Sequence, residues 1–378
     1  MVNVIRGDTA FKIVLFAYSF LPNKGGGEQY NFTLATGLSQ MGQDIFVVTP
    51  QKLKGRDSYP FPVIRTRTGL IGSVFDLNRV LRKIKPDLLH ISGPTPIDFL
   101  LFYIAKIHRV KVVLTYHADF PSTLGRMLNK LIFLFRKECS ILLVQTERDK
   151  QKLISRGIFE DQIIKFPFNG VNGNIFKLKN YGNRDIDILF IGRMDKEHSY
   201  KGYWALLEII KEIKKMGGER YPITIVGGSV DFPSFIEKSI GDNLTLKFLT
   251  DLDEEKLVYI LNRTKTIILP STSNSEGFGR VVLEAIFCGV VPVVSKYAGS
   301  SEIIDEYNAG IVIDPFNFKS SAEAMIDLLN NAQKLYEFRK NGIKMLAKGY
   351  FTIDWTINKT LEIYRKIVKQ EKSRKHLL

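Results

Sequence analysis

The stretch Pro270–Glu302, PSTSNSEGFGRVVLEAIFCGVVPVVSKYAGSSE, decides how the rest of the chain is interpreted. The β-rich run 266–269 comes directly before it and breaks into a polar loop, which predicts a buried strand that ends at a loop. After Gly277 and Gly279, apolar residues follow at helical spacing as far as Gly289, where a left-handed end of a helix is expected. The pattern therefore predicts a strand, a glycine-flanked turn and a buried helix.

The turn predicts a site for a ligand that has a phosphate in its middle and hydroxyl groups at both ends. Unpaired backbone N–H groups and the helix dipole favour an anion at the start of the helix. Glu276 lies just before the helix and Glu284 little more than one turn inside it, which would separate them by roughly 7–8 Å. Two solvated charges are the alternative, but Glu284 follows an apolar run, and a buried carboxylate needs a partner. A nucleotide sugar fits this description.

The segment Glu276-Gly277-Phe278-Gly279, followed by Glu284, resembles the Glu-x7-Glu signature of retaining glycosyltransferases of the GT-B fold, family 4. The resemblance implies an α/β chain of GT-B architecture. In this architecture two doubly wound, Rossmann-like domains with parallel sheets face each other across a cleft, and a C-terminal helix crosses back to the first domain. It also implies that Glu284 binds the nucleotide ribose and Glu276 the donor sugar, while Gly277, Phe278 and Gly279 contribute to donor binding.

The length and composition are those of a globular protein with two domains. The chain has 378 residues, of which 45% are hydrophobic and 25% charged. We predict an acceptor-side domain over 1–178, a nucleotide-sugar-binding domain over 179–353, and a crossover helix with a basic tail over 354–378. The crossover helix is expected from 354 to about 369, where apolar residues recur at helical intervals.

Two series of β-rich runs alternate with helical patterns, which favours two parallel sheets covered by helices. The first series comprises residues 11–17, 44–49, 63–66, 87–91, 111–115, 141–145 and 163–166. The second comprises residues 187–191, 223–226, 244–248, 266–269, 290–294 and 310–313.

Further candidate residues follow predicted strands, where doubly wound sheets bind ligands. Gly25 and Gly26 precede a helix expected from about residue 29, and they resemble the N-terminal Gly-Gly loop of the family. His117 follows a strand and is similar to the Thr-x-His element, which implies that it faces the transferred sugar. Arg193 and Lys201 resemble the Gly-Arg and Lys-Gly pair of the family; such cations can hold a diphosphate. We expect His117, Arg193, Lys201 and Glu276 to act in catalysis.

The sequence predicts neither a metal nor a resident cofactor. Cys139 and Cys288 stand in apolar surroundings, so we expect no disulfide and a reducing cytoplasmic location. Two Asp-x-Asp strings, 185–187 and 251–253, could suggest a metal motif. Their positions at the entrance of a strand and the start of a helix favour structural roles instead.

The positive charge is concentrated in the first half of the chain. Residues 1–178 hold 25 Lys and Arg against 13 Asp and Glu, within a total net charge of +15. This asymmetry predicts an anionic partner for the first domain. The helical pattern 124–138, with Arg126, Lys130, Arg136 and Lys137, either binds an anionic membrane peripherally or is a core helix with a basic outer face. No apolar run is long enough for a membrane span, and no signal peptide is evident.

The expected reaction is the transfer of a sugar from a nucleoside diphosphate to a hydroxyl group of a glycan or lipid-linked acceptor, with retention at the anomeric carbon. A sugar-nucleotide epimerase or a phosphorylase on the same fold is the alternative among enzymes. A nucleic-acid-binding protein would also explain the basic half, but no such motif is present. An inactive carbohydrate-binding module is a further alternative, which the intact set Arg193, Lys201, Glu276 and Glu284 disfavours.

Overall fold

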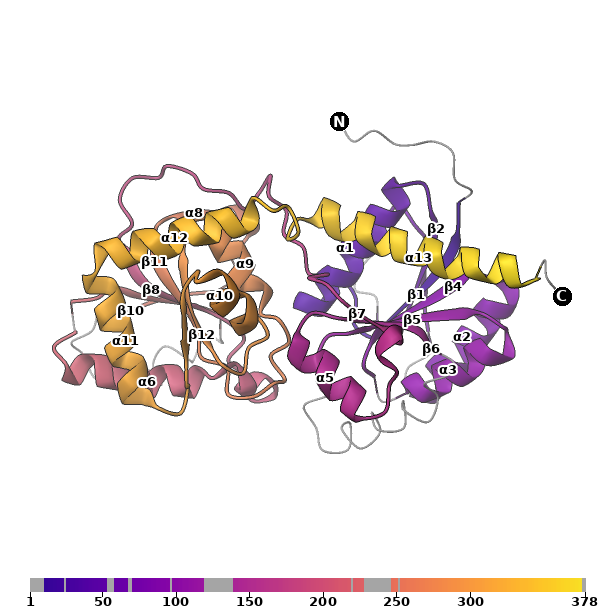
Figure 1. The fold of residues 1–378 in the computed structure, drawn as a ribbon, viewed down its shortest axis with the longest axis horizontal. Coiled ribbons are helices and arrows are strands. Elements are labelled where there is room, and N and C mark those ends of the chain that lie inside the picture. The colour runs from indigo at the N-terminus through magenta and orange to yellow at the C-terminus, as the bar shows by residue number, and fades with distance from the viewer. Residues whose placement is uncertain are drawn as a thin grey trace. The chain divides into compact units, whose positions relative to one another are not determined.

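The chain divides into two compact units, one of residues 1–170 with 353–378 and one of residues 171–352. The computed structural model describes residues 10–23, 25–52, 58–66, 70–95, 97–118, 139–218, 220–227, 246–250 and 252–375. Each unit is built on a parallel sheet with helices on both faces (Figure 1). The α/β class and the two doubly wound sheets predicted from the sequence are confirmed.

The first unit holds a seven-stranded sheet in the order β3-β2-β1-β4-β5-β6-β7. Its strands are β1 (Lys12–Ala17), β2 (Asp44–Thr49), β3 (Val63–Arg65), β4 (Leu88–Gly93), β5 (Lys111–Tyr116), β6 (Cys139–Val144) and β7 (Ile163–Lys165). Its helices are α1 (Gly26–Gln40), α2 (Leu70–Ile84), α3 (Asp98–Ile107), α5 (Glu147–Ser155), the short 3-10 helix η2 (Glu160–Gln162) and α13 (Ile353–Lys375). The strand order changes direction between β1 and β4, and this is where open α/β sheets bind ligands at the carboxyl ends of their strands.

One face of this sheet is covered by the first and last helices of the chain. Leu34 and Leu38 of α1 and Leu361 of α13 belong to the same buried cluster (Figure 1). The opposite face packs against α2 and α3 through buried side chains such as Leu77 and Phe102. The C-terminal helix therefore returns to the first unit, as the resemblance implied, and it continues to Lys375, beyond the predicted end.

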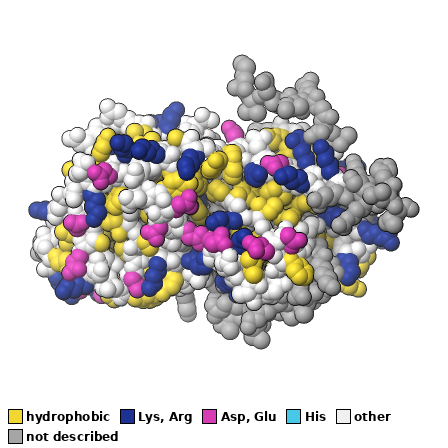
Figure 2. Space-filling model, in the orientation of Figure 1, with side chains coloured by type: hydrophobic (Ala, Val, Ile, Leu, Met, Phe, Trp, Pro, Cys, Tyr) yellow, Lys and Arg dark blue, Asp and Glu magenta, His cyan; other side chains and the backbone are white. Residues whose placement is uncertain are grey.

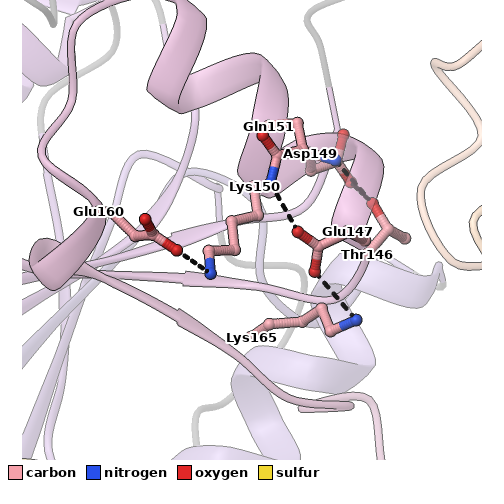
Figure 3. Close-up of polar contacts among 7 residues, drawn as sticks. All are labelled: Thr146, Glu147, Asp149, Lys150, Gln151, Glu160 and Lys165. Atoms are coloured by element: carbon pink, nitrogen blue, oxygen red, sulfur yellow. Dashed lines mark hydrogen bonds and ion pairs between the residues drawn. The ribbon is translucent and has the colours of Figure 1, made fainter.

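A polar turn fixes the start of α5 at the edge of this sheet. The Asp149 backbone N–H donates to Thr146 Oγ1 over 2.9 Å, and the Thr146 hydroxyl donates to the Asp149 carboxylate over 2.6 Å. Glu147 Oε1 accepts a hydrogen bond from Gln151, and its other carboxylate oxygen lies 3.2 Å from Lys165 Nζ on β7 (Figure 3). These contacts tie α5 to the neighbouring strand.

The second unit holds a six-stranded sheet in the order β10-β9-β8-β11-β12-β13. Its strands are β8 (Ile186–Ile191), β9 (Ile223–Val226), β10 (Leu246–Leu249), β11 (Thr264–Leu269), β12 (Val291–Ser295) and β13 (Ile311–Ile313). Its helices are the 3-10 helix η3 (Lys196–Lys201), α6 (Tyr203–Lys215), α8 (Glu254–Asn262), α9 (Arg280–Phe287), α10 (Ser301–Tyr307), α11 (Phe318–Asn330) and α12 (Ala332–Leu346). Here the strand order reverses between β8 and β11, so the loops after these two strands lie side by side.

The two faces of the second sheet have separate cores. Leu261 of α8, Val282 of α9 and Ile304 of α10 pack on one face. Leu206 of α6 and Met325 of α11 pack on the other. On the molecular face that Figure 2 draws, cationic and anionic side chains are interspersed with apolar ones.

Candidate active site

A glycine-bounded turn connects β11 to α9 in the second unit, as the sequence predicted. Gly279 precedes the helix at φ +77°, and a Cβ atom there would lie 2.6 Å from Leu269 Cδ2. The turn is also tied to the loop after β12, because the backbone N–H groups of Gly299 and Ser300 donate to the carbonyls of Gly277 and Phe278. This position therefore requires glycine, and the turn is fixed before any ligand binds.

Glu276 and Lys201 form an ion pair on this turn. Lys201 Nζ lies 2.8 Å from Glu276 Oε2, and Glu276 is only 6% exposed. Burial opposes the charge of Lys201, but the Glu276 carboxylate and the Tyr200 phenol favour it, and the net effect raises the pKa of the ammonium group. Lys201 therefore stays a cation at neutral pH.

The loop after β8 approaches the loop after β11 very closely. Gly202 has φ +74°, and a Cβ atom there would lie 1.8 Å from the carbonyl oxygen of Pro270. The Thr272 backbone N–H donates to the Tyr200 carbonyl over 2.8 Å. These contacts bring Lys201 to Glu276, although 75 residues separate them in the chain.

Arg193 is exposed and lies on the same loop, next to a histidine and an aspartate that we did not predict as site residues. Asp195 Oδ1 lies 2.6 Å from His198 Nδ1, and His198 Nε2 lies 3.3 Å from Arg193 Nη1. Because Arg193 can only donate, His198 Nε2 is the acceptor and Nδ1 carries the proton that is donated to Asp195. Asp195 and His198 therefore orient the guanidinium group. The three-residue spacing of Asp195 and His198 after a strand is the signal that could have identified them.

Glu284 has a partner on its own helix. Arg280 Nε lies 2.9 Å from Glu284 Oε1, one helical turn away, and the two side chains are 14% and 13% exposed. Burial raises the pKa of the Glu284 carboxyl group, while Arg280 acts in the opposite direction. The sequence predicted that a buried Glu284 carboxylate needs a partner, and Arg280 is that partner.

Two serine hydroxyls add unused hydrogen-bonding capacity to this edge of the sheet. Ser271 and Ser300 are fully buried, and neither Oγ atom has a hydrogen-bond partner within the part of the chain that the structure describes. Ser300 Oγ would lie 3.6 Å from a Cβ atom at Gly279. The turn is therefore surrounded by groups that can bind a polar ligand.

In the first unit, His117 follows β5 and lies among aromatic rings. Its Nε2 atom lies 3.0 Å from Ser92 Oγ, and its ring centroid lies 4.8 Å from that of Tyr30 and 5.3 Å from that of Phe168. Burial lowers the pKa of His117 to about 4. The imidazole is therefore neutral at pH 7, with one ring nitrogen that donates a hydrogen bond and one that accepts.

A row of polar side chains lies beneath His117 on β4 and β5. His90 on β4 is fully buried; its Nε2 atom lies 2.6 Å from Thr115 Oγ1, and its Nδ1 atom contacts the Tyr364 hydroxyl of α13. Thr115 Oγ1 also lies 3.0 Å from the Tyr30 hydroxyl. Burial, aided by His117, lowers the pKa of His90 to about 3. Sequence analysis did not identify this row, because its members lie far apart in the chain.

Gly25 and Gly26 lie at the start of α1, but the helix begins at Gly26, three residues before the predicted start. Gly25 is extended, and its carbonyl accepts the first intrahelical bond from the Gln29 N–H. A Cβ atom at Gly26 would meet nothing within 4 Å, so the space beside this first turn is open. The exposed backbone N–H groups of this turn can bind an anion.

The aspartates of the two Asp-x-Asp strings have structural contacts where the structure describes them. Asp185 pairs with Arg263, and Asp187 Oδ1 lies 2.6 Å from Lys265 Nζ. Asp253 accepts a hydrogen bond from the Lys256 N–H at the start of α8. Asp251 lies outside the described residues. Within the described ranges, no group of three or more His, Cys, Asp or Glu side chains could hold a metal ion.

The predicted basic helix 124–138 lies outside the described residues, with Arg126, Lys130, Arg136 and Lys137. Across the ranges that are described, no helix is both long enough and apolar enough to cross a bilayer. The two units are described separately, so His117 belongs to a candidate site in the first unit and Arg193, Lys201, Glu276 and Glu284 to one in the second.

Comparison with known proteins places both units in one group of enzymes. Residues 24–172 match the family described as Glycosyltransferase Family 4, and residues 173–345 match Glycosyl transferases group 1. The chain is 24% identical over 383 residues to O-antigen chain mannosyltransferase C of Escherichia coli, covering 95% of this chain and 99% of that protein.

Two further comparisons are with a relative whose name includes its sugar donor and with a solved structure. The GDP-mannose:cellobiosyl-diphosphopolyprenol alpha-mannosyltransferase of Komagataeibacter xylinus is 25% identical over 351 residues, covering 85% of each protein. The structure of Anabaena HepE in complex with UDP superposes with a TM-score of 0.77 at 16% identity, covering 94% of this chain and 100% of that one. The structural likeness supports the GT-B fold.

Proposed function

The chain belongs to the family 4 and group 1 glycosyltransferases of the GT-B fold, and from this premise we propose that it transfers a hexose-type sugar from a nucleoside diphosphate to an acceptor hydroxyl with retention of anomeric configuration. The observation that carries the proposal is the ion pair between Lys201 and Glu276, with Arg193 on the same loop.

The chemistry of the leaving group explains why cations belong at this edge of the sheet. When the bond between the anomeric carbon and the diphosphate oxygen breaks, that oxygen gains negative charge. Arg193 would contact the diphosphate through its planar fork and Lys201 as a compact charge. The N–H groups at the start of α9 would add to this field, and all of these groups are held in place before the reaction. They therefore stabilise the transition state more than the ground state.

The two carboxylates have different roles in the proposal. Glu276 would accept hydrogen bonds from hydroxyls of the donor sugar, and Glu284, held by Arg280, would bind the nucleotide ribose. Because Glu276 is paired with Lys201, we do not assign it as a covalent nucleophile. We favour a route in which the acceptor oxygen bonds to the anomeric carbon on the face from which the diphosphate leaves, and the acceptor proton passes to the diphosphate.

The names of the relatives favour a glycan or a lipid-linked sugar as the acceptor. One relative is named for the O-antigen chain and another for a cellobiosyl-diphosphopolyprenol. We propose that the present chain acts on an acceptor of this kind, whose phosphate or surrounding membrane is anionic. The excess of positive charge in residues 1–178 supports this choice.

The first unit carries a surface that fits an anionic membrane. Phe75 of α2 and Tyr103 and Ile107 of α3 are 66%, 52% and 58% exposed. The two helices meet nearby, because His108 Nε2 lies 2.7 Å from Asn78 Oδ1. Exposed cations lie on the same two helices and directly after α3: Arg79, Arg82, Lys83, Lys106 and Arg109. We name this set the α2–α3 surface and propose that it binds the bilayer peripherally.

The test of the proposed function has two steps. Thermal shift with UDP-, GDP-, ADP- and dTDP-linked sugars should identify the donor, since a ligand at about 100 times its Kd adds ~2.7 kcal/mol of stability. Incubation with that donor and acceptor glycans should then give a product whose anomeric configuration, read by NMR, equals that of the donor. An inverted product would exclude retention, and an epimerised donor without transfer would favour the epimerase alternative.

A further inference from the structure

Gln145 lies directly after β6, at the carboxyl edge of the first sheet, and its side-chain amide is unused. The residue is 8% exposed, and neither Nε2 nor Oε1 has a hydrogen-bond partner among the described residues. Leaving both ends of a buried amide unpaired costs free energy, and native proteins seldom do so outside functional sites. This glutamine therefore needs an explanation that packing does not supply.

The alternation of side chains along β6 directs Gln145 toward His117. Leu143 packs into the core beneath α1 and α13, whereas Leu142 and Val144 pack on the opposite face. Gln145, two residues after Leu143, continues on the face of α1 and α13. Thr115 on β5 is the register partner of Leu143, and His117 is two residues after Thr115, so this register, continued past the ends of both strands, would place Gln145 next to His117.

Two more amide side chains, each next in sequence to a residue whose ring contacts His117, have a buried oxygen without a partner among the described residues. Asn169 follows Phe168, whose ring centroid lies 5.3 Å from that of His117, and its Oδ1 atom has no partner in the described part of the chain. The same is true of Asn31 Oδ1, although Asn31 Nδ2 donates to the Ser19 carbonyl. Asn31 is adjacent to Tyr30, whose ring also contacts His117. Each of these two aromatic residues that contact His117 is therefore followed by such an amide.

The chemistry of these groups selects a neutral, hydroxyl-rich ligand. A carboxamide presents one acceptor and two donor hydrogens, which match two neighbouring hydroxyls of a sugar ring. A carboxamide carries no net charge, so the Gln145 amide offers no opposite charge to a phosphate.

We propose that the Gln145 carboxamide binds the hydroxyl groups of a sugar ring that lies against His117. Gln145 is then a substrate-binding residue that determines which sugar is accepted, and it takes no part in proton transfer. This inference rests on the proposed glycosyltransferase function, because it assigns a subsite of the same reaction.

Replacing Gln145 by methionine tests the proposal in two independent ways. Gln145→Met keeps the length of the side chain and removes its polar ends, so the unliganded protein should gain stability, with a Tm higher by about 2–4 °C. The value of kcat/KM for transfer, with the donor and acceptor identified above, should fall at least tenfold, since a substrate hydroxyl loses its partner. Binding of the free nucleoside diphosphate, measured by calorimetry, should not change.

Gln162 provides the matched control, because its Nε2 atom donates to the Cys139 carbonyl over 2.7 Å in the same unit. Gln162→Met should lower Tm and leave transfer unchanged. A Gln145→Met protein with lower Tm and wild-type transfer would overturn the proposal and make Gln145 structural. A wild-type protein that binds no nucleotide sugar would overturn the proposed function instead, and the stability comparison would still decide whether the amide of Gln145 is unpaired.

Discussion

Lys201 Nζ lies 2.8 Å from Glu276 Oε2, which joins the loops after β8 and β11 where the strand order of the second sheet reverses. Strand order alone brings these loops together, and glycines at positions 202 and 279 allow the close approach. A cation for the leaving group and a carboxylate for sugar hydroxyls are thus held in one fixed arrangement. The predictions below follow from this arrangement and from its counterpart in the first unit.

Arg193→Ala should lower turnover by about 100- to 1000-fold without changing stability, because the residue is exposed and the diphosphate loses one stabilising charge.

Lys201→Ala should lower turnover as much, but it should also lower the free energy of unfolding by about 3 kcal/mol, since it leaves the buried Glu276 carboxylate unpaired. Steady-state kinetics and urea unfolding separate the two effects. Unchanged turnover in both variants would remove the diphosphate assignment.

Glu284→Ala should chiefly weaken donor binding, whereas Glu276→Ala and His117→Ala should chiefly lower kcat. The reason is that, of these three residues, Glu276 and His117 are the ones proposed to contact the reacting sugar. Donor Kd by calorimetry and kcat at saturating donor measure the two effects separately. Glu284→Gln is the milder comparison, because it retains a hydrogen-bonding group beside Arg280. The opposite partition between binding and turnover would mean that the donor lies in the reverse orientation.

Stability should fall as the pH drops below about 6.5, because two buried histidines resist protonation. Burial, aided by His117, lowers the pKa of His90 from 6.5 to about 3, and burial lowers the pKa of His117 to about 4. The unfolded chain therefore binds more protons than the folded one below pH 6.5, and folding free energy is lost toward pH 4. Urea unfolding between pH 7.5 and 5 measures the slope.

The buried His90 provides the decisive comparison for this pH dependence. His90→Gln should be less stable at pH 7, because Thr115 and Tyr364 lose a partner, and its stability should depend less on pH than that of the wild type. A wild-type stability that is constant from pH 6.5 to 5 would contradict the prediction.

The sheets, the turn before α9 and most strand positions could be predicted from local patterns, because apolar runs and glycines are visible within ten residues. The partner of Glu284 was also within reach, since Arg280 lies one helical turn away. By contrast, His90 is a polar residue in a mostly apolar strand, and its partner Tyr364 is 274 residues distant. The start of α1 was predicted too late, because glycine propensity is a poor guide in a first turn, where N–H groups have no helical partner anyway.

The last prediction concerns the α2–α3 surface, whose cations and exposed apolar side chains would act together on an anionic bilayer. Each Lys or Arg near such a surface contributes about 1 kcal/mol, and the attraction decays over roughly 8 Å at physiological salt.

The protein should therefore co-sediment with phosphatidylglycerol-containing vesicles at low salt and dissociate at high salt, and it should not bind phosphatidylcholine vesicles. Changing Arg79, Arg82 and Lys83 to Gln should reduce binding at low salt, and Phe75→Ser should also reduce it at low salt. Phe316→Ser is the matched control, because Phe316 is 48% exposed but belongs to the second unit. Equal binding to both vesicle types, or to neither, would exclude the membrane and favour an acceptor glycan free in solution, because the cations of the first unit would then have no anionic surface to bind.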